Sequence, residues 1–158
     1  MSKRIVLAEE THIVNVLPAI DIAGGATGDV FSMENHDHVS FIISVGVSAA
    51  AFTKILVNEC TSLAAAGATA IPFRLYKEET ALGDTLDAGA AVAATGYTPS
   101  ANDGIMYIVE VDAAALSEGS HFLQLSLTNA SGNSIIASAI AVLTGNRYSG
   151  SQSATAIA

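Results

Sequence analysis

The stretch His38-Val-Ser-Phe-Ile-Ile-Ser-Val-Gly-Val47 decides the fold class of this chain. Its side chains alternate between two faces, with Phe41, Ile43, Val45 and Val47 on one face and Ser40, Ile42, Ser44 and Gly46 on the other. A period of two with one apolar face is typical of a β-strand that covers a core. The stretch therefore predicts a half-buried strand.

The same pattern recurs along the chain. Further strands are predicted over Thr53–Cys60, Ala70–Tyr76, Ile105–Val111, His121–Thr128 and Ser134–Thr144. Pro72 lies inside one of them and predicts an edge position or a bulge, because proline cannot donate a hydrogen bond to the ladder. The one predicted helix spans Asp112–Gly119, with Asp112 as its cap and Gly119 as its left-handed end.

Seven or eight short strands with one short helix indicate an all-β fold, an antiparallel β-sandwich or jelly-roll-like domain. We expect three parts: an N-terminal arm over residues 1–29, a β-sandwich domain over residues 30–145 and a C-terminal tail over residues 146–158. The arm contains the strand-like segment Ile13–Leu17. It is either an edge strand of its own domain or a strand that reaches a neighbouring subunit.

Composition excludes several classes of function. The 158 residues carry a formal net charge of −9 and only six Lys and Arg. Because nucleic acids and anionic membranes are bound through clustered basic residues, neither is an expected partner. There is no run of eighteen apolar residues, and residues 1–20 lack a signal-peptide pattern. The single Cys60 permits no intramolecular disulfide, which fits synthesis in a cytoplasm.

One segment, Glu34–His38, has residue types that bind metals. On a strand, His36 and His38 share a side with Glu34, and His121 would complete a zinc or iron site if folding brought it near. The favoured interpretation is a polar turn that leads into the next strand. We therefore expect no cofactor and no enzymatic activity.

Two groups of residues are candidate interface positions. Arg74, Tyr76 and Lys77 lie together near a predicted sheet edge, and Arg147 and Tyr148 follow the last strand. Arg and Tyr are favoured where protein interfaces concentrate their binding energy. Ordinary surface is the alternative for both groups.

Several phrases resemble small structural proteins of tailed bacteriophage particles, of the kind encoded near the major capsid protein. The phrases are Gly28–Asn35, His38–Ile43, Phe73–Lys77, Ala94–Tyr97, Asp103–Asp112 and Gly145–Tyr148. Together they span roughly residues 28–148. None of them is a catalytic signature.

The resemblance implies a head decoration (cement) protein. Such a protein is β-rich, needs no cofactor and binds the major capsid protein on the outside of the head as a homotrimer or homodimer. Its expected location is the virion. A tail or neck component is the structural alternative, and a ligand-binding β-sandwich module is the alternative from a different class. A carbohydrate-binding module usually displays Trp or several exposed aromatic side chains, and this chain has no Trp and four Tyr.

Overall fold

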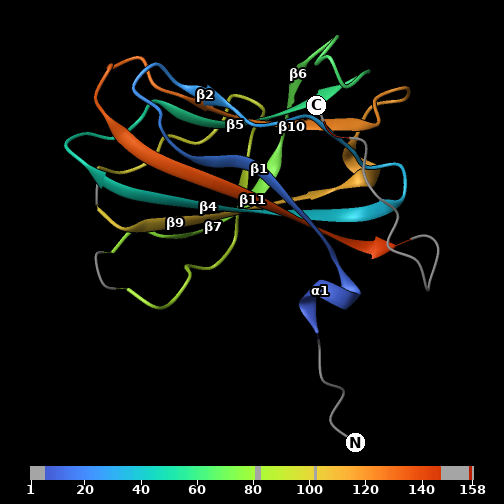
Figure 1. The fold of residues 1–158 in the computed structure, drawn as a ribbon, viewed down its shortest axis with the longest axis horizontal. Coiled ribbons are helices and arrows are strands. Elements are labelled where there is room, and N and C mark those ends of the chain that lie inside the picture. The colour runs from blue at the N-terminus through green and yellow to red at the C-terminus, as the bar shows by residue number, and fades with distance from the viewer. Residues whose placement is uncertain (1–5, 81–82, 102, 147–156, 158) are drawn as a thin grey trace, which may run out of the picture.

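The protein folds into two antiparallel β-sheets packed face to face (Figure 1). The computed structural model describes residues 6–80, 83–101, 103–146 and 157. The all-β sandwich predicted from the sequence is confirmed. No helix among the described residues is long and apolar enough to cross a membrane.

The larger sheet has six strands. In spatial order they are β1 (His12–Asp21), β11 (Ile135–Asn146), β4 (His36–Ser48), β9 (Ile105–Asp112), β7 (Phe73–Glu78) and β8 (Ala90–Val92). The smaller sheet runs in the order β2 (Ala26–Thr27), β10 (Phe122–Thr128), β5 (Lys54–Cys60) and β6 (Thr69–Ile71). β3 (Phe31–Ser32) pairs with β10 along the same edge as β2. Two short helical elements complete the fold, α1 (Leu7–Glu10) and the 3₁₀ turn η1 (Ala113–Ala115).

The core lies between the two sheets and forms one continuous cluster. The larger sheet supplies it chiefly from β4 and β9, through the fully buried Val39, Phe41, Ile43, Tyr107 and Val109. The smaller sheet supplies Leu123, Leu125, Leu127, Ile55 and Val57. These positions follow the predicted alternation, because successive side chains of a strand point to opposite faces.

The prediction for Val47 is wrong, because its side chain is 76% exposed. The register between β11 and β4 shifts between Ile135 and Ala137, opposite this end of β4. An extra residue in one strand of a pair reverses the facing of the side chains beyond it. The next residue, Ser48, is accordingly buried.

The predicted arm is also wrong for residues 12–29, which belong to the sandwich. β1 pairs with β11 and forms an edge of the larger sheet, so the edge-strand interpretation holds. Val14, Val16 and Leu17 are buried in the core. Two register shifts and Pro18 interrupt this edge strand. Such irregularities discourage a further strand from pairing with it.

The single strand predicted over Ala70–Tyr76 is two strands in different sheets. β6 is an edge strand of the smaller sheet, whereas β7 lies between β9 and β8 in the larger one. Pro72 stands between them and has no N–H to give to either ladder. The chain therefore crosses from one sheet to the other at this residue.

The helix predicted over Asp112–Gly119 is reduced to η1. Asp112 makes no side-chain cap, and its carboxylate instead contacts His38 on β4. Gly119 does adopt a left-handed conformation, with φ of 84°. At the C-terminal side, β11 ends at Asn146. The predicted interface residues Arg147 and Tyr148 lie outside the described residues. Ile157 forms a β-bridge with Phe31.

The difference in burial between two residues of β4 allows a direct test of which face of this strand lies in the core. Replacing the fully buried Ile43 with Ala is expected to lower the free energy of unfolding by about 2–5 kcal/mol, because it leaves a cavity between the sheets. Val47→Ala on the same strand is the control and is expected to cost less than about 1 kcal/mol. Urea denaturation measures both. Equal losses at the two positions would contradict the assignment of the inner face.

Candidate interaction surface

The outer face of the larger sheet carries an apolar row that crosses four strands. Pairing places Ile140 of β11 beside Ile42 of β4, Ile42 beside Ile108 of β9, and Ile108 beside Tyr76 of β7. In an antiparallel sheet, side chains directly opposite one another on one face lie about 5 Å apart. The four side chains therefore form one line of contact across the sheet.

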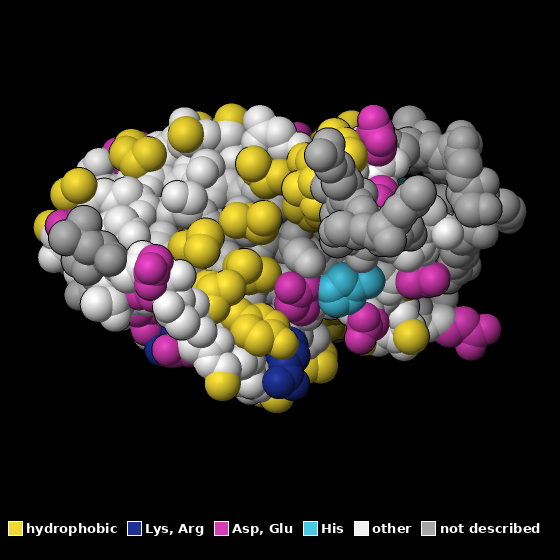
Figure 2. Space-filling view, turned by 90° about the horizontal axis from the view of Figure 1, so that it is seen from below, with side chains coloured by type: hydrophobic (Ala, Val, Ile, Leu, Met, Phe, Trp, Pro, Cys, Tyr) yellow, Lys and Arg dark blue, Asp and Glu magenta, His cyan; other side chains and the backbone are white. Residues whose placement is uncertain are grey.

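One end of this row is open to solvent, since Ile140 is 42% exposed. The same face also exposes Ile136 on β11, at 49%, and Ile13 on β1, at 43%. Figure 2 looks onto this face and shows hydrophobic side chains gathered in a band across it. Scattered apolar side chains are ordinary on a protein surface, whereas a continuous apolar patch marks an interaction site. We call this patch the outer-face row, defined by Ile140, Ile42, Ile108 and Tyr76.

Two of the predicted interface residues border the row. Arg74 lies on the outer face of β7, and its Nε donates to the Tyr76 hydroxyl at 3.2 Å. The Arg74 guanidinium carbon lies 5.7 Å from the centre of the Tyr76 ring, and Nη2 donates to the Gly89 carbonyl. Lys77, predicted to join them, instead turns toward Glu79 and Tyr97. Successive side chains of β7 point to opposite faces, which separates Lys77 from Arg74 and Tyr76.

A charged cluster lies beside the row. The two ring nitrogens of His38 each contact a carboxylate, Nδ1 at 2.7 Å from Asp112 and Nε2 at 2.6 Å from Glu110. Ser40 also donates to Glu110 at 2.6 Å. Carboxylates only accept hydrogen bonds, so both nitrogens of His38 carry hydrogen and the ring is an imidazolium. Partial burial opposes that charge, but the hydrogen bonds that His38 donates to Asp112 and Glu110 outweigh burial and raise the pKa of His38.

The structure does not bring the proposed metal ligands together. His36 is buried and stacks on His12, with 5.7 Å between ring centroids, whereas His38 faces Glu110 and Asp112. Burial, with the nearby His12, lowers the pKa of His36. Among the described residues, no three or more His, Cys, Asp or Glu side chains are grouped so as to hold a metal ion.

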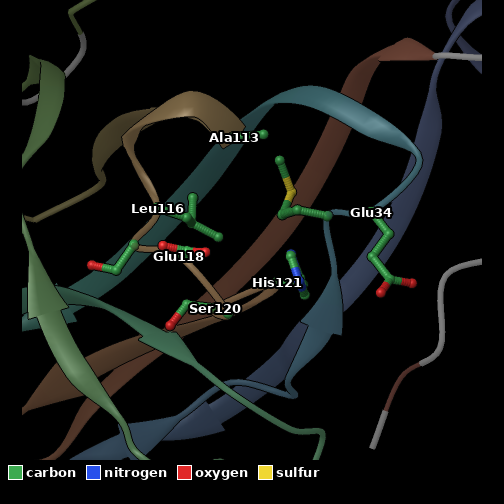
Figure 3. Close-up of a pocket in the computed structure, with 9 residues that line it drawn as sticks. Glu34, Ala113, Leu116, Glu118, Ser120 and His121 are labelled. Atoms are coloured by element: carbon green, nitrogen blue, oxygen red, sulfur yellow. The ribbon is translucent and has the colours of Figure 1, made fainter.

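The third predicted ligand, His121, lies instead at a cavity of about 510 Å³ beside η1. In Figure 3, Glu34 and Glu118 lie to either side of His121. The other described lining residues are small or apolar and include Met33, Leu116 and Ser120, with no Phe, Tyr or Trp on which a sugar ring would stack. The cavity therefore has mixed chemistry without a matched set of partners.

Sequence reasoning missed the densest polar network of the described residues. Glu79 accepts hydrogen bonds from Lys77 at 2.6 Å, from Tyr107 at 2.7 Å, from Tyr97 at 3.0 Å and from the Ser100 backbone at 3.1 Å. Burial alone would raise the pKa of Glu79, but these four donors lower the pKa to about 2. Burial and the Glu79 carboxylate raise the pKa of Tyr107.

No local sequence pattern predicts this network, because its tyrosines lie 18 and 28 residues from Glu79 in the sequence. It fastens the segment after β7 to β9 and to the loop that contains Ser100. That places it behind β7, the strand on which Arg74 and Tyr76 face outward. Its hydrogen bonds hold the end of β7 in position against β9.

Comparisons of the chain with family models, curated proteins and solved structures gave no match.

Removing the Glu79 carboxylate is expected to destabilise the protein in a pH-dependent way. The pKa of Glu79 falls from 4.5 to about 2 on folding, so its contribution is complete above about pH 4.5 and is lost as the pH falls toward 2. Glu79→Gln is expected to lower the free energy of unfolding on the order of 3 kcal/mol at pH 7, with a smaller loss at pH 3.

Chemical denaturation across that pH range measures the effect, and the exposed Glu118→Gln is the control, expected to change stability by less than about 0.5 kcal/mol. A Glu79→Gln penalty that does not depend on pH would contradict the assignment.

The His38 cluster predicts the opposite dependence on pH. The pKa of His38 is raised above its ordinary value of 6.5 in the folded protein. The stabilisation that His38 contributes is therefore complete below about pH 6.5 and is lost as the pH rises through the folded-state pKa. His38→Gln is therefore expected to be less stable than the unmodified protein at pH 5.5, with a gap that closes at high pH. The measurement is the midpoint of urea unfolding against pH. A gap that widens toward high pH would show that His38 is neutral in the folded state.

Proposed function

We propose that this chain is a structural subunit of a bacteriophage particle, a head decoration (cement) protein that binds the major capsid protein on the outside of the head and stabilises the capsid lattice. The observation that carries the proposal is the outer-face row, an apolar surface crossing four strands of a rigid sheet. Continuous apolar surface of this kind fits contact with another protein.

The resemblance supports the same proposal from the sequence. Three of its phrases, His38–Ile43, Phe73–Lys77 and Asp103–Asp112, supply β4, β7 and β9, which are neighbours in the larger sheet. The phrases that resemble phage structural proteins therefore contribute three of the four residues of the outer-face row, Ile42, Tyr76 and Ile108.

The physical mechanism is avidity. A shell presents many identical binding positions, and a subunit that touches its neighbours as well as the capsid protein is held by several modest contacts at once. The chain as a whole has a net charge of −9, which limits clumping of particles by repulsion. Neither nucleic acid nor membrane is a partner in this proposal.

The composition of purified phage particles tests the proposal. We expect the chain in a copy number comparable to that of the major capsid protein. We also expect particles assembled without it to release their DNA at lower temperature, because contacts that bridge capsid subunits are missing. The measurements are quantitative mass spectrometry of the particles and a thermal release assay with a dye that detects DNA. Absence of the chain from particles, or its presence only in tails or necks, would overturn the proposed function.

A further inference from the structure

We propose that His36 is an acid-sensitive switch built into one end of the larger sheet, where β1 begins and β11 ends. His36 is the first residue of β4, and it pairs with Asn146, the last residue of β11. Its ring stacks on that of His12, the first residue of β1. The ends of three strands therefore meet at one histidine. This switch belongs to the chain itself and does not depend on the proposed function.

The His36 ring is buried without hydrogen-bond partners. The residue is 1% exposed, and neither ring nitrogen has a partner among the described residues. The Oδ1 atom of Asn146 is also buried and unpartnered within the described structure. Buried polar atoms without partners are rare and destabilising. Three such atoms at one strand end therefore mark this end of the sheet as weakly held.

Protonation makes the arrangement at His36 unfavourable. A neutral imidazole has one donor and one acceptor, whereas an imidazolium has two donors and a full positive charge. The described residues offer neither nitrogen an acceptor, and burying an uncompensated charge is strongly unfavourable. The charged ring therefore reaches water only if His36 moves away from Asn146 and His12, which opens this end of the sheet locally.

The charged groups around His36 do not compensate for its burial. His12 on β1 opposes protonation of His36, because it can carry a positive charge of its own. Asp37, the next residue on β4, favours protonation, and Glu34 in the preceding turn is exposed. Asn146 on β11 is uncharged. Burial is the largest effect, and together with His12 it lowers the pKa of His36 below the ordinary 6.5.

The direction of the pH effect follows from this shift. The open form takes up the proton at the ordinary pKa of 6.5, whereas the closed form takes it up only at lower pH. Opening is therefore favoured as the pH falls below about 6.5, by at most about tenfold for each pH unit. Between about pH 6.5 and 4.5 the contributions of His38 and Glu79 are both complete, so this window isolates His36.

Amide hydrogen exchange of the full chain tests the proposal. Protection factors, corrected for the intrinsic effect of pH on exchange, are compared at about pH 7 and about pH 5. We expect protection of residues 36–39 and 143–146 to fall roughly 3- to 30-fold at the lower pH. Residues 90–92 of β8, at the opposite edge of the sheet, fray without exposing His36 and are expected to keep their protection.

Variants of His36 show whether this residue causes the loss. His36→Gln stays uncharged at both pH values and is expected to remove the loss of protection. His36→Phe is a second variant with the same expectation, in case glutamine prevents folding, and far-UV circular dichroism checks that each variant is folded. His121→Gln changes an exposed histidine just before β10 and is the matched control, expected to retain the loss.

An NMR titration of the His36 ring gives an independent reading, with a midpoint expected below pH 6.5. Protection that does not change with pH, a loss in acid that the folded His36 variants retain, or a His36 ring that titrates at or above pH 6.5 would overturn the inference.

Discussion

The pairing of β4 between β11 and β9 is the interaction on which the rest of the structure depends. Ten residues of β4 are in register with β11 and eight with β9. Because side chains alternate strictly along a strand, a slip of one residue would turn Phe41 and Ile43 to solvent and Ile42 and Ser44 into the core. The buried inner face therefore fixes the register, since exposing those side chains would cost several kcal/mol.

The surface that we assign to protein contact follows from the same register. Once Phe41 and Ile43 are fixed inward, Ile42 faces outward, and the ladders bring Ile140, Ile108 and Tyr76 into line with it. The charged groups lie in the neighbouring rows, where His38 joins Glu110 and Asp112 and Arg74 joins Tyr76. A single pairing pattern thus produces both the core of the domain and an apolar line on its outside.

Sequence reasoning succeeded where the determining contacts are local and failed where they are distant. The alternation in β4, β9 and β10 needs only neighbouring residues, and it predicted those strands and their inward side chains, with the exception of Val47 at the end of β4. The helix over Asp112–Gly119 failed because the Asp112 carboxylate bonds His38, 74 residues away, in preference to capping. Arg74, Tyr76 and Lys77 were predicted as one group, and the structure brings only Arg74 and Tyr76 into contact. Glu79 was not predicted, because its tyrosine partners are brought to it only by folding.

The central claim is that the outer face of the larger sheet is covered by protein when the chain performs its function. Electron cryo-microscopy of intact phage particles tests that claim most directly. The account predicts density for the two-sheet domain on the outside of the head, with Ile140 and Ile42 buried against the capsid protein. A domain that leaves this face open to solvent, or whose density is missing from the particle, would contradict it.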